Sequence, residues 1–406
     1  DLKNFYLQFL VLLKIFQNKK RQLKICVLSE KNFELYATIT STILSKNICI
    51  PLDPESPDNF LKEIVEQVNP DLILVGEMKN GKLINFFKKR KIFIMKLKLI
   101  KNYKIIQDRH LENNPTNKDL AFIFFTSGSS GKPKGVKMTF LNFISSLNGQ
   151  IENIYKKKYK KNLIFGDYHN TSFVIILNIL LPCLYLGETI SPAKKTSEKF
   201  FPIEHLNSNK VNILITLPST LNRMKLEAKN DLLKNKLLIL ILCGEPFYFD
   251  LLKFIKTNYQ PKKIFNCYGS TELSPWVFSY QFNKKDEHII KKKGLVPIGK
   301  NFKGVKYKIL KNKELIVSGP MVNKYLNPAD DKINKVKDKN GVTWYKTRDV
   351  VIKKDNKVFV MGRNDSVVKV QGNRVELKGI ESKIRLLSSV KNCLVEYSNK
   401  SKKIIA

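Results

Sequence analysis

Short runs of β-branched and other apolar residues alternate with longer segments of helical periodicity, and this alternation constrains the fold more than any other feature. Strands are expected at six such runs, namely Lys24–Leu28, Asp71–Val75, Ala121–Phe125, Val211–Thr216, Leu237–Leu242 and Lys263–Cys267. Helical patterns lie between several of them, at Phe33–Ser45, Phe140–Tyr155 and Phe247–Thr257. Alternation of this kind is typical of helices packed on largely parallel sheets. The sequence therefore predicts an α/β fold.

The pattern changes after about Gly294, where short strands and turns dominate. We expect strands at Lys306–Leu310, Glu314–Val317, Val350–Ile352 and Val358–Val360, which predicts a β-rich subdomain. A chain of 406 residues is long enough for two or three domains. We expect a large N-terminal region over residues 1–362 and a truncated start of a small α+β C-terminal domain over residues 363–406. Because the sequence lacks an initial Met and stops in an expected strand, we interpret it as a fragment.

Lysine and arginine outnumber aspartate and glutamate by 73 to 35, which gives a formal net charge of +38. The lysines are spread along the whole chain and no aromatic-and-basic pattern accompanies them, so a nucleic-acid partner is not predicted. The most apolar stretch, Phe173–Gly187, contains Asn178 and Pro182 and is shorter than the roughly 20 residues of a membrane span. Six cysteines without a CxxC pair are typical of a reduced, cytoplasmic protein.

A polar, glycine-rich segment, Thr126–Val136, directly follows the expected strand Ala121–Phe125. Its backbone N–H groups and hydroxyls can wrap a polyphosphate, and Lys132 and Lys134 add positive charge. The spacing is that of neither a Walker A loop nor a GxGxxG dinucleotide fingerprint. A plain surface turn is the alternative, but eleven consecutive residues of this type disfavour it. The sequence therefore predicts a phosphate-binding loop.

The segment resembles the phosphate-binding signature of the adenylate-forming superfamily, which includes acyl-CoA synthetases, luciferases and the adenylation domains of nonribosomal peptide synthetases. Other motifs of that superfamily follow in its order, at Ser45–Pro54, Leu242–Phe247, Asn266–Glu272, Glu314–Pro320, Tyr325–Asn327, Tyr345–Asp349 and Gly362–Leu377. The first two are most similar to amino-acid adenylation domains and D-alanine–carrier protein ligases. The resemblance covers about residues 24–395.

This resemblance implies ATP and Mg²⁺ as cofactors. It assigns ATP binding to Thr126, Ser127, Gly128, Ser129, Ser130, Gly131, Lys132, Gly135, Tyr268, Gly269, Asp349 and Arg363. Catalytic roles fall to Thr271, Glu272 and Lys134, with Mg²⁺ on Glu272, while Asp365 is the hinge between the two domains. Tyr268 is expected to stack on adenine and Asp349 to accept hydrogen bonds from the ribose. Arg348 stands where the superfamily usually has glycine, and the C-terminal catalytic lysine lies beyond the last residue.

The same resemblance gives a substrate pocket of eight residues: Asp167, Asn170, Val174, Ile241, Cys243, Cys267, Pro275 and Trp276. Amino-acid-activating members carry an aspartate at the position of Asn170, where it pairs with the substrate ammonium. An asparagine cannot neutralise that charge. We therefore expect Asp167 to take this role if the substrate is an amino acid.

The resemblance implies activation of a carboxylic acid, preferably an amino acid, as an acyl-adenylate with release of pyrophosphate. The acyl group would then pass to the phosphopantetheine thiol of an acyl or peptidyl carrier protein. One alternative is an acyl- or aryl-CoA ligase, which the missing aspartate favours. Another is a degenerate, non-catalytic nucleotide-binding module, which Arg348 and the missing lysine favour but the intact nucleotide motifs oppose.

Overall fold

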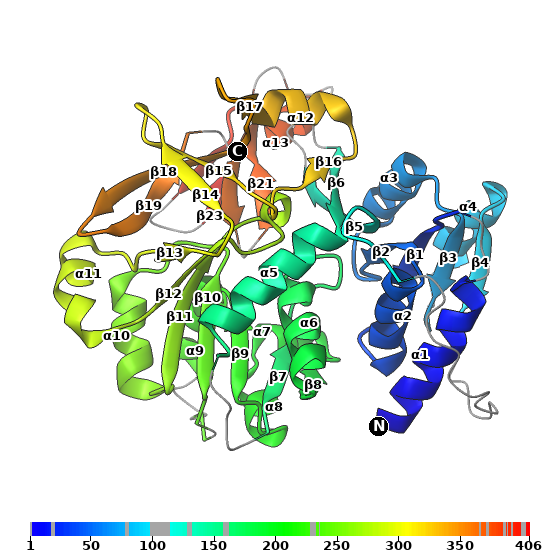
Figure 1. The fold of residues 1–406 in the computed structure, drawn as a ribbon, viewed down its shortest axis with the longest axis horizontal. Helices are drawn as coiled ribbons and strands as arrows, with labels where there is room; N and C mark the ends of the chain where they lie inside the picture. The colour runs from blue at the N-terminus through cyan, green and yellow to red at the C-terminus, as the bar shows by residue number, and fades with distance from the viewer. Residues whose placement is uncertain are drawn as a thin grey trace.

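The structure is a computed structural model of the chain. It describes residues 2–17, 21–77, 81–97, 114–127, 132–156, 162–227, 233–234, 236–364, 367–370, 373–384, 387, 389–390, 393–398 and 403–406. Within them, two large mixed sheets lie beside each other and a smaller antiparallel sheet lies above the second (Figure 1). None of the described helices is long and apolar enough to cross a bilayer.

The first sheet has the strand order β16-β6-β5-β2-β1-β3-β4. Strands β1 to β5 pair in parallel, whereas β6 and β16 run antiparallel at one edge. Alternate residues of β1 point to opposite faces, which α1 and α2 cover on one side and α3 and α4 on the other. The elements are α1 (Leu2–Gln17), β1 (Lys24–Leu28), α2 (Phe33–Leu44), β2 (Ile48–Leu52), α3 (Asp58–Val68), β3 (Leu72–Val75), α4 (Gly81–Lys89), β4 (Phe93–Lys96), β5 (Leu120–Ser127), β6 (Pro133–Thr139) and β16 (Lys324–Tyr325).

The second sheet has the order β13-β12-β11-β10-β9-β7-β8, and its strands β7 to β11 pair in parallel. Its strands are β7 (Ile164–Asp167), β8 (Thr189–Pro192), β9 (Ile213–Thr216), β10 (Ile239–Cys243), β11 (Lys263–Tyr268), β12 (Phe278–Gln281) and β13 (Lys300–Asn301). The accompanying helices are α7 (Thr196–Phe200), α8 (Ile203–Ser208), α9 (Pro218–Glu227), α10 (Phe249–Asn258) and α11 (Glu287–Lys293), with short 3-10 turns η2 (Thr271–Leu273) and η3 (Lys284–Asp286).

Two helices, α5 (Phe140–Asn153) and α6 (Leu177–Leu186), fill the space between the two sheets (Figure 1). The short turn η1 (Val174–Ile176) leads into α6. Phe143 and Leu180 pack against the first sheet, whereas Ile179 and Cys183 pack against the second. These two helices therefore contribute to the core of each sheet.

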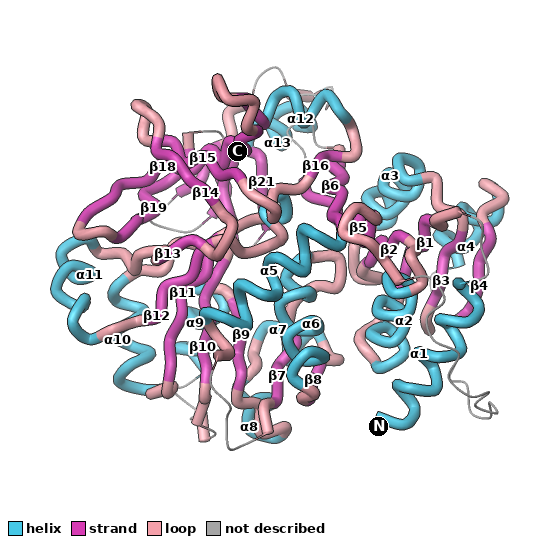
Figure 2. Tube along the Cα trace, viewed as in Figure 1, coloured by secondary structure: helices cyan, strands magenta, loops and turns pink. Residues whose placement is uncertain are grey.

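The predicted β-rich part forms a third sheet of order β14-β15-β18-β17, with β19 paired to β18 (Figure 2). Its elements are β14 (Lys306–Ile309), β15 (Glu314–Ser318), α12 (Pro328–Asn334), β17 (Lys335–Lys337), β18 (Thr343–Lys354) and β19 (Lys357–Arg363). The elements that follow are β20 (Val367–Val370), β21 (Asn373–Glu376), α13 (Leu377–Ile384), β22 (Glu396–Ser398) and β23 (Lys403–Ile405).

The α/β prediction is confirmed, and so is the β-rich region after Gly294. The main difference is in length: the runs Val350–Ile352 and Val358–Val360 belong to two long strands, β18 and β19, that form a hairpin. The full length of β18 could not be predicted from its apolar run, because exposed and partly exposed positions interrupt the apolar pattern along the strand.

Candidate functional site

A cavity of about 710 Å³ lies at the carboxyl ends of parallel strands from both large sheets. Thr126 reaches it from β5, His169 and Asn170 follow β7, and Gly244 and Gly269 follow β10 and β11. Val375 and Ile380 line it from the C-terminal elements. Ligands of open α/β sheets bind at this edge because the loops that leave the strands diverge there.

Tyr268, Asp349 and Arg363 form one hydrogen-bonded cluster in the cavity wall. The Tyr268 hydroxyl donates to Oδ2 of Asp349, and Nη1 of Arg363 lies 2.9 Å from Oδ1 of the same carboxylate. Burial, together with the charge of Asp349, raises the pKa of Tyr268 well above its usual value, so the phenol stays a donor. Each carboxylate oxygen can accept more than one hydrogen bond, so Asp349 retains capacity for a ligand.

Arg348, just before Asp349, has a φ of +64°, in the left-handed region. Glycine adopts this conformation without strain, which explains why glycine suits the position. The turn therefore forms with arginine in place, at a steric cost. The backbone N–H of Arg348 donates to Oε1 of Glu314 at 3.1 Å, which helps to hold the turn.

Thr271 and Glu272 lie in η2, beside the Tyr268 cluster, and both line the cavity. Glu272 is 1% exposed, and its Oε1 accepts a hydrogen bond from the Tyr325 hydroxyl at 2.9 Å. The described residues contain no group of three or more His, Cys, Asp or Glu side chains that could together hold a metal ion. One carboxylate still fits Mg²⁺, which proteins commonly hold through one or two carboxylates, water and substrate phosphates.

The predicted phosphate loop connects β5 to β6, which pair in antiparallel register from Leu120–Thr139 to Ser127–Pro133. Its central residues Gly128, Ser129, Ser130 and Gly131 lie outside the described residues. Among the described ones, Thr126 lines the cavity and Lys132 is exposed. The structure does not bring Lys134 or Gly135 to the cavity: Lys134 Nζ lies 3.0 Å from Oδ1 of Asp330, and Gly135 packs closely against Leu326.

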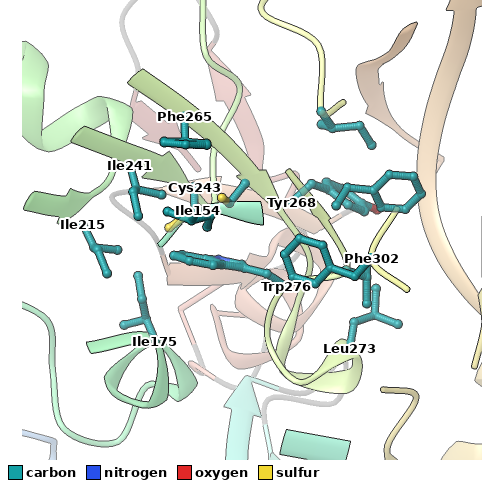
Figure 3. Close-up of a cluster of buried hydrophobic side chains, with 14 of the residues drawn as sticks. Ile154, Ile175, Ile215, Ile241, Cys243, Phe265, Tyr268, Leu273, Trp276 and Phe302 are labelled. Carbon is teal, nitrogen blue, oxygen red and sulfur yellow. The ribbon is translucent and has the colours of Figure 1, made fainter. Parts of the chain in front are cut away.

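The absence of a side chain at Gly269 lets the loop after β11 fold back on itself. A Cβ atom there would lie 1.9 Å from the carbonyl oxygen of Pro275. This close approach brings Pro275 and Trp276 into the cavity wall with Cys243 and Val174. Figure 3 shows the Trp276 ring inside the apolar cluster, near Cys243 and Ile175. This end of the cavity is therefore largely apolar.

Asn170 also lines the cavity, and its orientation is determined by Ser172. The backbone N–H and the hydroxyl of Ser172 lie 3.0 and 2.7 Å from Oδ1 of Asn170. Because a backbone N–H can only donate, it identifies this atom as the oxygen and leaves the NH₂ group as the part of Asn170 that can serve a ligand. Asp53 holds the same loop by accepting from the backbone N–H of Thr171 at 2.9 Å.

Asp167 does not line the cavity. Its side chain is fully buried, with Oδ1 2.9 Å from Nζ of Lys31 and Oδ2 2.7 Å from the Tyr36 hydroxyl. The predicted ammonium contact thus has no support in the arrangement, because a lysine already neutralises the carboxylate. Ile241 is likewise a buried core residue, and Cys267 lines a second cavity of about 850 Å³ that Tyr268 also lines.

His169 lines the cavity but was not among the predicted site residues. Its Nε2 lies 2.9 Å from the carbonyl oxygen of Ile215, so this nitrogen carries the proton. Burial lowers the pKa of His169 to about 4, and the charge of Lys31 adds to the effect. The imidazole is therefore neutral at pH 7. The sequence signal for His169 is its position directly before Asn170, a predicted pocket residue.

The arrangement resembles that of known proteins. The chain matches the family described as AMP-binding enzyme over residues 11–324. It is 24% identical to the D-alanine–D-alanyl carrier protein ligase of Staphylococcus aureus (strain N315) over 360 residues. It is 26% identical to the ligase of the same name from Staphylococcus epidermidis (strain ATCC 35984) over 365 residues. Both matches cover 88% of this chain and 71% of the relative.

Two solved structures show the same fold. One is the Vibrio cholerae adenylation domain AlmE in complex with glycyl-adenosine-5'-phosphate, with a TM-score of 0.81 and 18% identity. The other is o-succinylbenzoate CoA synthetase MenE from Bacillus subtilis, with a TM-score of 0.78 and 18% identity. Each comparison covers 98% of this chain and 81% of the other.

Proposed function

The chain belongs to the AMP-binding enzyme family and is an adenylate-forming ligase, and on that premise we propose that it activates an acid in the 710 Å³ cavity and passes the acyl group to a phosphopantetheine thiol. The observation that carries this proposal is that one cavity brings together two kinds of wall. The polar wall holds Tyr268, Thr271, Glu272, Asp349 and Arg363, whereas the other wall is apolar around Trp276. A nucleotide suits the first wall and the organic part of an acid suits the second.

In this proposal the carboxylate of the acid attacks the α-phosphorus of ATP, and pyrophosphate leaves. Both reactants are anions, so catalysis depends on positioning and on neutralising charge. Thr271 would contact the α-phosphate, Asp349 the ribose, and the ring of Tyr268 the adenine. Mg²⁺ held on Glu272 would offset phosphate charge, and Thr126 with Ser127, Lys132 and the adjoining loop would hold the β- and γ-phosphates.

Transfer to the thiol would use the second cavity. It shares Tyr268, Gly269, Asp349 and Arg363 with the first, and C-terminal residues such as Val370 and Tyr397 also line it. A thiol that enters through this cavity would reach the acyl-adenylate at the residues that the two cavities share. The division into residues 1–362 and 363–406, with rotation about Asp365, stays a prediction; Asp365 lies outside the described residues.

An amino acid is the first candidate for the acid. The curated relatives are named as D-alanine–D-alanyl carrier protein ligases, and a similar adenylation domain holds a glycyl-adenylate. The Pro51–Pro54 and Cys243–Glu245 motifs have the amino-acid-activating form. A carrier protein that bears phosphopantetheine is the acceptor in this version of the proposal.

An acid without an α-amine is the second candidate, and the geometry around Asn170 favours it. Asn170 presents hydrogen-bond donors to a ligand, and Lys31 already neutralises Asp167. A buried ammonium beside donors and without a carboxylate costs several kcal/mol. A neutral hydroxyl or carbonyl at the same place would accept a hydrogen bond instead. An acyl- or aryl-CoA ligase is the corresponding reaction.

Pyrophosphate exchange distinguishes the candidates. The protein extended through its C-terminal domain would be assayed with amino acids and with their 2-hydroxy and desamino analogues. Exchange with an amino acid alone would select the first candidate, and exchange with the amine-free analogues alone the second. ATP·Mg²⁺ binding by this chain, measured by calorimetry, addresses the non-catalytic alternative: binding without exchange for any acid would favour it.

A further inference from the structure

One side-chain amide in the cavity wall has no hydrogen-bond partner in the part of the chain that the structure describes. Asn178, in the first turn of α6, is 0% exposed and lines the 710 Å³ cavity. Neither Oδ1 nor Nδ2 has a partner among the described residues. Buried polar groups in folded proteins are almost always hydrogen-bonded, so this amide needs a physical explanation.

The other buried asparagines show how this chain usually satisfies such a group. Asn47 accepts from the backbone N–H of Leu23, and Asn266 donates to two backbone carbonyls. Asn142 donates to the carbonyl of Pro320, and Asn323 to that of Thr271. Among the buried asparagines that the structure describes, Asn178 alone lacks a partner for both atoms.

The backbone adds a second polar group at the same position. In a regular helix the carbonyl of Asn178 would accept from the N–H four residues later. That residue is Pro182, which has no N–H to donate. The regular helical donor to this carbonyl is therefore missing.

The cavity-lining residues that precede Asn178 most closely in the sequence have no hydrogen-bonding side-chain group. Val174 and Ile175, in the turn η1 that leads into α6, line the same cavity and are apolar. Trp276 and Cys243 line the apolar part of the cavity from the second sheet. The polar residues assigned to the nucleotide belong to β5 and the loop after it, to β11 and the turn after it, and to β18 and β19, not to α6. Asn178 is thus a hydrogen-bonding group in a segment whose other cavity-lining residues, Val174 and Ile175, are apolar.

We propose that Asn178 is a specificity-determining residue that recognises a neutral hydrogen-bonding group, a hydroxyl or a carboxamide, on the side chain of the acid. The inference rests on the proposed function, since it takes this cavity as the acid site. An amide offers two donors and an acceptor, so it can serve either group. An apolar acid would leave the amide without a hydrogen-bond partner. Sites built to hydrogen-bond a substrate discriminate strongly against analogues that lack the hydrogen-bonding group.

Matched pairs of acids test the proposal. Each pair has one shape and differs only in polarity: threonine and valine, asparagine and leucine, and 3-hydroxybutyrate and 3-methylbutyrate. Calorimetry on this chain with ATP·Mg²⁺ present should show at least tenfold tighter binding of the polar member in one pair or more. Asn178→Leu, close in volume, should reduce that preference to below twofold without lowering the melting temperature, because no internal hydrogen bond is lost.

Asn266→Leu is the matched control, since it removes an amide that donates to two carbonyls and should lower the melting temperature. The proposal is overturned if no pair binds, if the parent protein has no polar preference, or if Asn178→Leu keeps the preference. Pyrophosphate exchange measured in parallel tests the proposed function separately from the role of Asn178. Preferred binding of polar acids with no exchange for any acid would refute the proposed function but support the role of Asn178. Exchange with apolar acids alone would support the proposed function but refute the role of Asn178.

Discussion

The Nζ atom of Lys31 lies 2.9 Å from Oδ1 of Asp167, and the two side chains are 4% and 0% exposed. Lys31 follows β1 of the first sheet and Asp167 ends β7 of the second, so the pair joins the sheets at the edge where the cavity lies. Tyr36 donates to the other carboxylate oxygen. The buried charge is therefore compensated within the protein, and stability depends on both partners.

Replacing Lys31 with methionine should destabilise the fold by about 3–5 kcal/mol, because it leaves a buried carboxylate without a counter-charge. Chemical unfolding measures the change. Lys256→Met is the control: Lys256 pairs with Glu287 where both side chains are about a third exposed, and its loss should cost at most about 1 kcal/mol. Adding Asp167→Asn to Lys31→Met should recover part of the loss. Equal costs for the two single variants would contradict the assignment.

His169 should make stability depend on pH. Its pKa in the folded protein is about 4, below the value of about 6.5 for an unperturbed histidine, so the unfolded chain takes up the proton first as pH falls. This contribution is complete above about pH 6.5 and is lost as pH falls towards 4, by about 3 kcal/mol in all. Lys31 and Asp167, the charged groups nearest to it, have opposing effects on the pKa.

The variant His169→Gln, which keeps a donor for the Ile215 carbonyl, separates this contribution from that of other titrating groups. Unfolding free energies of the parent protein and the variant would be measured from pH 7 to pH 4. The parent protein should lose more stability than the variant over this range. Parallel curves would show that His169 is not held neutral by burial.

Replacing Asp349 with alanine should reduce ATP affinity at least tenfold. The carboxylate is proposed to accept from the ribose hydroxyls, and hydrogen bonds to a charged group contribute roughly 1.5–3 kcal/mol each. Calorimetry with ATP·Mg²⁺ measures the change. Asp338→Ala is a suitable control, because Asp338 belongs to the same subdomain but lines neither cavity, and ATP affinity should be unaffected. Unchanged ATP affinity in Asp349→Ala would show that Asp349 does not bind the ribose.

Adding one methyl group at Gly269 should disrupt the cavity wall. The new Cβ would lie 1.9 Å from the carbonyl oxygen of Pro275, so the loop that carries Trp276 must shift. Overpacking of this kind costs about 1–3 kcal/mol or more, and acid binding should fall with it. Gly362→Ala adds the same methyl group where nothing lies within 4 Å, and should have little effect. Similar melting temperatures for the two variants would show that the loop is not tightly packed.

Local patterns were sufficient for much of the fold and for several residues that line the cavity around Tyr268. Strand β1 has the bounds predicted from its apolar run, and the residues around Tyr268 could be recognised because each motif is contiguous in the sequence. Burial on both faces of a parallel strand requires continuous apolar runs, which are visible in the sequence. The hydroxyl, carboxylate and glycine in Gly269–Glu272 are likewise visible without tertiary structure.

Only the tertiary structure decided which of several nearby side chains reach the cavity. Asn170 does and Asp167, three residues earlier, does not; Cys243 does and Ile241, two residues earlier, does not. Lys31 neutralises Asp167 across 136 positions of sequence, and Asn178 lies in an apolar stretch where its lack of a partner cannot be seen. The physical reason is that burial and hydrogen-bond satisfaction depend on which distant elements pack together, whereas local patterns record only the periodicity of each element.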